Sequence, residues 1–182
     1  MRSKDKIYEE FLAASARLGD RKSLESLIKY RGPRLFAHAY RLLGNREEAA
    51  DVVQDAWVEI TRGLPNLREP RAFSAWAYRI VSRRCAKMIA QNIKHRRISE
   101  TVDISTVPEG NPVEQASDTQ AVRAAINQLT LDQAATIRLF YLEDFSVAEA
   151  ALALDIPVGT VKTRLMHARK ILKTYLKGDY DV

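Results

Sequence analysis

Residues 146–172 read SVAEAALALDIPVGTVKTRLMHARKIL, and this stretch decides how the C-terminal part of the chain folds. Ser146 stands before an apolar run, and Glu149 follows three residues later, which is the reciprocal capping pattern of a helix start. Asp155 and Ile156 break that helix, and Pro157 suits the beginning of the next one. Because another helix, LDQAATIRLFYLEDF, comes before them, the order of the segments predicts a helix-turn-helix.

The second helix of this motif has two chemically different faces. Apolar residues recur at spacings of four, three and four, and they predict a buried seam: Val161, Leu165, Ala168 and Leu172. Residues 158–177 hold six basic residues and no acidic one, whereas a solvated helix usually mixes both signs. The pattern favours binding to the major groove of DNA. A basic surface for an acidic protein is the alternative.

Composition limits the class of protein. The 182 residues carry a formal net charge of +6, which favours an anionic partner. Cys85 is the single cysteine, so an internal disulfide is excluded, in keeping with a reducing compartment. No apolar run is long enough to span a bilayer, and the first residues lack the apolar core of a signal peptide. We expect a cytoplasmic protein without membrane insertion.

The distribution of charge divides the chain into domains. Residues 1–99 contain 21 Lys and Arg against 11 Asp and Glu, whereas residues 100–118 contain five acids and no base. The acidic segment also holds two prolines and a glycine, and it can bury too little to offset the entropy of ordering. We predict a first domain over 1–97, a flexible acidic linker over 98–118 and a second domain over 119–182.

Both domains are predicted to be all-α. Almost nothing alternates with a period of two, and helix-forming residues dominate throughout. Gly19 and Gly44 stand where the first two helices should close, because glycine tolerates the left-handed conformation on which helices often end. The first domain should be a small helical bundle, with helices over about 6–18, 22–43, 46–63 and 70–92.

Two helices of the first domain carry more charge than packing requires. On the third, acids recur at spacings of three and four on one face: Glu48, Asp51, Asp55 and Glu59. Such a row suits a basic partner, although an ordinary solvated face has the same pattern. On the fourth, Arg79, Arg83 and Lys87 form a basic row close to three aromatic residues, a combination that single-stranded nucleic acid uses. The alternative is that these rings simply pack in the core.

An enzyme is not expected. The three histidines, His38, His95 and His167, are far apart in sequence, and none pairs with Cys85 at the spacing of a metal site. A Gly-rich phosphate loop and a nucleophile motif are both missing. We therefore predict no catalytic residue, no metal and no cofactor, and we interpret His38 and Cys85 as packed side chains.

Three segments together resemble the extracytoplasmic-function sigma factors of bacterial RNA polymerase. They are NREEAADVVQDAWVEI at 45–60, PRAFSAWAYRIVSRR at 70–84 and the helix-turn-helix segment from Leu129 to Leu172. The resemblance implies an alternative sigma factor that binds core polymerase, opens specific promoters and is controlled by an anti-sigma factor. A stand-alone helix-turn-helix regulator and a sigma-like decoy that binds only an anti-sigma factor are the alternatives.

The resemblance also implies roles for particular residues. Contacts to the clamp coiled coil of the polymerase β′ subunit would come from Glu48, Asp51, Gln54, Asp55 and Glu59, with further contacts to the β subunit. The minus-ten element, first duplex and then a melted single strand, would meet Arg68, Arg71, Phe73, Trp76, Tyr78, Arg79, Arg83, Arg84 and Lys87. The loop 64–71 would receive a flipped base.

The same resemblance assigns the minus-thirty-five element to the helix-turn-helix. Base edges would be read by Lys162, Thr163, Met166 and His167, with Thr160 at the helix start. Phosphates would be held by Arg164, Arg169 and Lys170, which position a helix without reading sequence.

Overall fold

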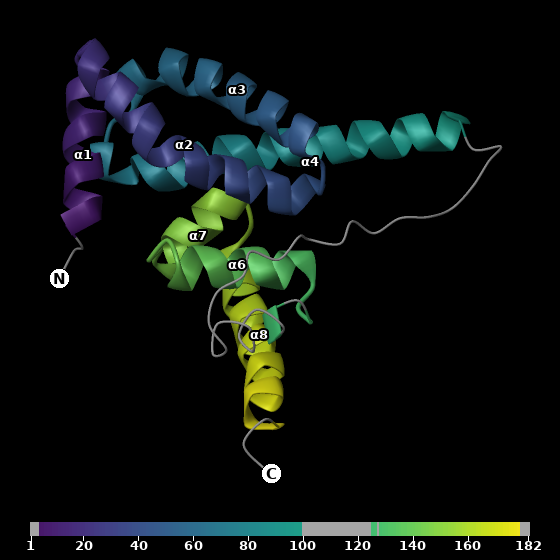
Figure 1. The fold of residues 1–182 in the computed structure, drawn as a ribbon. Helices are drawn as coiled ribbons and strands as arrows, with labels where there is room; N and C mark the ends of the chain where they lie inside the picture. Colours follow the sequence, from purple (N-terminus) through teal and green to yellow (C-terminus); the bar gives the residue numbers. More distant parts are fainter. Residues whose placement is uncertain (1–3, 100–124, 127, 179–182) are drawn as a thin grey trace. The chain divides into compact units, whose positions relative to one another are not determined.

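The computed structural model describes residues 4–99, 125–126 and 128–178, and every regular element in these ranges is helical. The chain divides into two compact units. The first contains α1 (Lys4–Arg17), α2 (Arg21–Leu43), α3 (Arg46–Gly63) and α4 (Phe73–Ser99), with two 3-10 turns, η1 (Leu64–Asn66) and η2 (Pro70–Ala72), between α3 and α4. The second contains α6 (Leu131–Tyr141), most of α7 (Val147–Leu154) and α8 (Val158–Gly178) (Figure 1). The predicted all-α fold is confirmed.

The predicted linker cannot be followed in the structure. Its first two residues continue α4, which ends at Ser99, and the remainder, 100–118, lies outside the described residues. Within the described ranges, no helix combines the length and the apolar character needed to cross a membrane.

The helix ends in the first unit form where the sequence predicts them. Gly19, two residues after the end of α1, and Gly44, directly after α2, adopt φ angles of +96° and +71°, the left-handed conformation. Asp20 and Asn45 then cap the starts of α2 and α3, because each side chain accepts two backbone N–H groups of the following turn. The hydroxyl of Ser23 also donates to Asp20 and lowers the pKa of that carboxyl.

Helix α2 lies at the centre of the first unit, where it packs against α1, α3 and α4. Apolar side chains from the three longer helices fill the space between them, and the largest are fully buried: Leu27 and Leu35 on α2, Ile60 on α3, and Phe73, Tyr78 and Val81 on α4. Burial of these side chains is the main favourable contribution to folding of this unit.

In the second unit, α8 packs against α6 through the predicted seam. Val161, Leu165 and Ala168 are buried and Leu172 is half-buried, which confirms the periodicity argument. The capping pattern before α7 is also confirmed. The N–H of Ser146 donates to Glu149 Oε2 at 2.7 Å, and the N–H of Glu149 donates to Ser146 Oγ at 3.2 Å.

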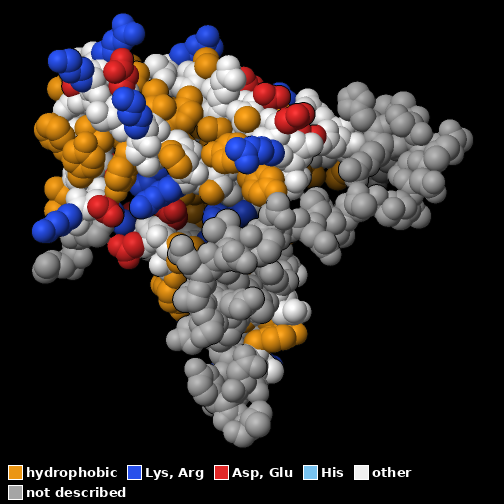
Figure 2. Space-filling model, in the orientation of Figure 1, with side chains coloured by type: hydrophobic (Ala, Val, Ile, Leu, Met, Phe, Trp, Pro, Cys, Tyr) orange, Lys and Arg blue, Asp and Glu red, His pale blue; other side chains and the backbone are white. Residues whose placement is uncertain are grey.

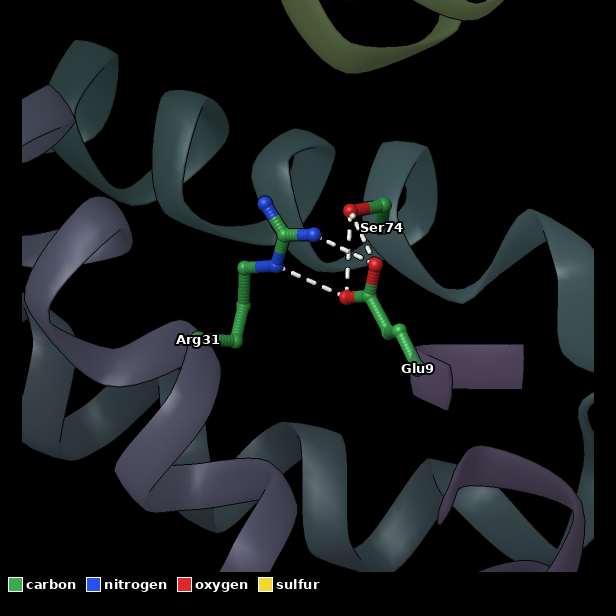
Figure 3. A network of polar contacts seen from close by, with 3 residues as sticks. All are labelled: Glu9, Arg31 and Ser74. Atoms are coloured by element: carbon green, nitrogen blue, oxygen red, sulfur yellow. Dashed lines mark hydrogen bonds and ion pairs between the residues drawn. The ribbon is translucent and has the colours of Figure 1, made fainter. Parts of the chain in front are cut away.

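One polar network lies inside the first unit and joins three of its helices. Arg31 on α2 donates from Nε to Glu9 Oε1 on α1 at 2.7 Å and from Nη2 to Glu9 Oε2. Ser74 at the start of α4 donates to the same carboxylate at 3.1 and 3.2 Å, as Figure 3 shows. Both charged side chains are only 5% exposed. The attraction between the two charges is therefore the main compensation for the hydration that each loses on burial.

We expect Arg31→Met to lower the free energy of unfolding of the first unit by about 3–5 kcal/mol, because it leaves the Glu9 carboxylate buried without its counter-charge. The double variant Glu9→Leu with Arg31→Met should recover most of this loss. Both tryptophans, Trp57 and Trp76, lie in the first unit, so urea unfolding followed by tryptophan fluorescence reports on it.

The matched control is Arg21→Met, which removes a similar pair with Glu25 from the surface, where the side chains are 89% and 55% exposed. It should change stability little. Equal losses for the Arg21 and Arg31 variants would contradict a structural role for the buried pair.

Candidate functional site

The acidic row on α3 is partly compensated by α4. Arg84 donates to Asp55 Oδ2 at 3.0 Å and forms an ion pair with Glu59 Oε2 at 2.8 Å. Glu48 accepts a hydrogen bond from Asn92 Nδ2 at 3.0 Å. Acidic side chains gather over α3 on the face that Figure 2 shows. Arg84, which the resemblance assigns to the minus-ten element, therefore faces the acidic row of α3.

Two residues of the predicted polymerase surface have side chains without a polar partner among the described residues. Asp51 and Gln54 are exposed, and neither side chain forms a hydrogen bond or ion pair with another residue in the described part of the chain. Gln54 also lines a mostly apolar groove of about 480 Å³ between α2 and α3. The other residues lining the groove are Ile28, Trp57, Val58, Thr61 and Arg62.

Sequence reasoning missed this groove. One signal was present, because Val58 is an apolar residue that does not share the helix face of the buried Val52, Ala56 and Ile60, and it is 46% exposed. The exposure of Ile28 on the neighbouring helix has no equally clear signal in the sequence.

The basic row on α4 keeps its three predicted residues. Arg83 and Lys87 are exposed and Arg79 is half-buried, so these three residues share one face of the helix. In the preceding loop, Arg68 and Arg71 are exposed, and Arg71 forms an ion pair with Glu69 at 3.1 Å. Five cations thus remain on the surface of the loop and the helix.

The aromatic part of this prediction is mostly wrong. Phe73 and Tyr78 are 0% and 2% exposed, so their rings offer no face to a ligand, and the packing alternative fits them. Trp76 is half-buried and packs at the end of α3, where a Cβ on Gly63 would approach its ring within 2.9 Å. A glycine at position 63 therefore lets the indole lie against the backbone that enters the loop.

Helix α8 presents an exposed, mainly polar face away from its buried seam. Lys162, Thr163, His167 and Lys170 are exposed, and Met166 is 60% exposed. Thr160 is half-buried. The Thr163 hydroxyl donates to the Gly159 carbonyl at 3.0 Å within the same helix. Among the described residues, this face is exposed along the first half of the helix.

Two arginines of α8 are held against α6. Arg164 is 23% exposed and forms an ion pair with Asp132. Arg169 donates from Nε to the Tyr141 hydroxyl at 2.9 Å, and its guanidinium lies 5.5 Å from the ring centroid of Phe140. Both residues thus help to fix α8 on α6. Of the three predicted phosphate contacts, Lys170 is the one whose side chain has no partner in the described ranges.

Two reactive groups considered in the sequence, His38 and Cys85, are packed. His38 is 5% exposed, and its Nε2 lies 2.9 Å from Ser82 Oγ, which confirms the packing interpretation. Cys85 is 1% exposed, and burial raises the pKa of its thiol to about 12. Among the described residues, no three metal-ligating side chains lie close enough to hold an ion.

Comparison with known families separates the two units. Residues 27–94 match the family model for Sigma-70 region 2, and residues 119–172 match the model for Sigma-70, region 4. The first match covers α3, the loop and most of α2 and α4, and the second covers α6, α7 and most of α8. Helix α1 lies outside both matches.

Individual proteins agree with this result. SigE, an extracytoplasmic-function RNA polymerase sigma factor of Mycolicibacterium smegmatis, is 28% identical over 85% of this chain, which spans 62% of SigE. SigM of Mycobacterium tuberculosis is 29% identical over 92% of this chain and 83% of SigM. The solved complex of the sigma factor RpoE with the anti-sigma factor NepR from Bartonella quintana is similar at a TM-score of 0.69 and 26% identity, over 86% of this chain and 98% of the matched chain.

Cys85 should be inert in the folded protein. At pH 8 we expect iodoacetamide to alkylate it about a thousand-fold more slowly than in urea, because the thiolate is the nucleophile and the folded thiol has a pKa of about 12. The unfolded chain loses this proton above about pH 9 and the folded chain keeps it, so stability should fall as the pH rises from there. Rapid labelling of the folded chain, followed by mass spectrometry, would contradict the burial of the thiol.

Proposed function

This chain belongs to the sigma-70 family of RNA polymerase sigma factors and acts as an alternative sigma factor in transcription initiation, and we propose that its two units divide this work between them. Residues 1–97 bind core polymerase and the minus-ten element, residues 119–182 bind the minus-thirty-five element, and residues 98–118 link the two. The main support is the position of the two family matches. The first includes the charged rows of α3 and α4, and the second includes the basic face of α8, which the sequence pattern indicates as binding surfaces.

The polymerase contact is centred on Asp51 and Gln54. The side chains of these two residues are exposed and have no polar partner among the described residues. Asp55 and Glu59, in contrast, both accept hydrogen bonds from Arg84, and Glu48 accepts one from Asn92. The groove beside Gln54 adds apolar area to the same surface. An acidic and apolar surface of this kind suits the basic face of a coiled coil, here the clamp of the β′ subunit.

The minus-ten contact uses the loop 64–71 and the exposed row of α4. Arg68, Arg71, Arg83 and Lys87 offer cations to the phosphates of the melted strand, with Arg79 at the edge of the row. The loop receives a flipped base, and contacts in its pocket offset the cost of unstacking. Trp76 is half-buried beside the entry to the loop. Of the three aromatic residues assigned to the minus-ten element, it is the one with some exposed surface.

The minus-thirty-five contact uses the exposed face of α8. Lys162, Thr163, Met166 and His167 lie in the first half of that helix, which is the part that reaches base edges in a helix-turn-helix complex. Lys170 binds a phosphate. Because each unit alone binds DNA modestly, the linker supplies affinity by holding the second unit near its element once the first is bound.

Control by an anti-sigma factor in the cytoplasm completes the proposal. The related sigma factor RpoE has been solved with the anti-sigma factor NepR, at 26% identity to this chain. A partner of that kind would act by covering the polymerase surface of the first unit or the DNA surface of the second.

Run-off transcription from a library of random promoters, with bacterial core polymerase and with or without this protein, tests the proposal directly. We expect transcripts only with the protein, from templates that share two spaced elements. Core binding without any transcript from such a library, or no core binding at all, would contradict it.

Charge reversal at Asp51 tests the polymerase surface. Asp51→Lys should weaken binding to core polymerase by about ten-fold or more, because it places a cation against a basic partner. Asp51 is preferred to Asp55 for this test, because reversal of Asp55 would also place a new cation beside Arg84 and disturb a contact within the protein. The measurement is fluorescence anisotropy with labelled protein and core polymerase.

The matched control is Glu25→Lys, an exposed acid on α2 outside the acidic row. It should bind core polymerase as the unchanged protein does. If Asp51→Lys and Glu25→Lys behave alike, Asp51 does not lie in the contact.

Two substitutions on α8 separate phosphate contacts from base contacts. Lys170→Ala should weaken binding of the holoenzyme to all promoters and reduce the slope of log K against log salt by about one. Met166→Ala should instead change the preference among minus-thirty-five sequences. Filter binding over a salt series measures both, with the exposed Lys29→Ala on α2 as the control. An unchanged slope for Lys170→Ala is the result that would remove this residue from the interface.

A further inference from the structure

Helix α1 lies outside both family matches, yet it contacts the loop that the proposed function assigns to the flipped base. It packs against both turns of that loop, η1 and η2, and Figure 1 shows the connection from α3 to α4 passing beside it. The contact at the end of α1 is polar. Arg17 donates from Nη1 to the carbonyl oxygen of Leu67 at 2.9 Å and to that of Arg68 at 3.2 Å.

These two carbonyl groups belong to the part of the loop without regular structure. The Leu67 N–H closes η1 by donating to the Leu64 carbonyl at 3.0 Å, and the Ala72 N–H donates to the Glu69 carbonyl at 2.9 Å. Between these turns Leu67 and Glu69 are extended, with ψ angles of 109° and 102°, and Arg68 forms a bend. Arg17 therefore fixes Leu67 and Arg68, whose carbonyl groups are not bonded within either turn.

The position of Arg17 is itself fixed by the way in which α1 ends. Gly19, at φ +96°, follows the helix, and its N–H donates to the Ala16 carbonyl at 3.0 Å. At the other side of the loop, Glu9 of α1 accepts the hydrogen bond from Ser74, the second residue of α4. One rigid helix thus holds the loop at its middle and at its exit.

We propose that Arg17 is a positioning residue for promoter opening. By fixing the Leu67 and Arg68 carbonyls in the free protein, it sets the shape of the loop before DNA arrives. A loop without this hydrogen-bond donor would have to become ordered while it captures the base, and that entropic cost would weaken capture. The inference rests on the proposed role of the loop 64–71 as the base-binding element.

The test couples Arg17 to single bases of the promoter. With a promoter selected from the random library, the holoenzyme is assayed for opening by permanganate reactivity on templates that carry one abasic site at each non-template position of the minus-ten element in turn. For the unchanged protein, we expect one position at which loss of the base slows opening by about ten-fold or more. For Arg17→Ala, opening of the intact promoter should slow by about ten-fold. The abasic site at that position should then slow opening by this variant little further.

A general loss of stability would give a different result. It would slow opening on every template and leave the effect of the abasic site unchanged. Arg17→Lys, which keeps one charged donor, should recover part of the opening rate and part of the coupling. Arg21→Ala, the loss of an exposed cation four residues away, is the matched control and should behave as the unchanged protein.

The outcomes distinguish the two proposals. If the unchanged holoenzyme opens no selected promoter, the proposed function fails, and the inference fails with it. If it opens promoters and shows the sensitive base, but Arg17→Ala keeps the full abasic effect, only the positioning role of Arg17 is overturned. Core binding and the thermal unfolding midpoint of each variant, measured in parallel, should stay close to those of the unchanged protein.

Discussion

The buried pair between Glu9 and Arg31 is the interaction on which the first unit depends. Two opposite charges lose most of their hydration at a point where α1, α2 and α4 meet, so each requires the other to remain in place. The Arg31 guanidinium also lies 6.0 Å from the ring centroid of Tyr78, on α4. Because Ser74 completes the network at the start of α4, the same contact determines where the loop from α3 has to end.

Charge on the surface of this unit is distributed by the contacts between α3 and α4. Arg84 and Asn92 bind three of the four acids in the row, so Asp51 is the acid that stays available to a partner. Exposed pairs of this kind add little to stability, but they decide which charges a ligand can meet. The same principle holds on α8, where Arg164 and Arg169 contact residues of α6 while Lys170 stays exposed.

Local rules account for the parts of the structure that were predicted correctly. Helix periodicity located the seam of α8, glycines located the ends of α1 and α2, and the capping pattern located the start of α7. Such features depend on residues at most a few positions apart, so the sequence contains all the information that they need. The aromatic prediction failed for Phe73 and Tyr78 because a ring at helical spacing can face either the core or a ligand. Only packing of α4 against its neighbours distinguishes these cases.

The sequence by itself determined that the chain is helical, where most of its helices begin and end, which face of α8 is buried, and which families its two parts resemble. The tertiary structure alone decided which charged residues of each row remain free, that a groove opens beside Gln54, and that Arg17 reaches the carbonyls of a loop 50 residues away. The reason is the range of the interactions. Helix formation and capping act between near neighbours in sequence, whereas ion pairs and side-chain contacts between helices depend on how distant segments pack.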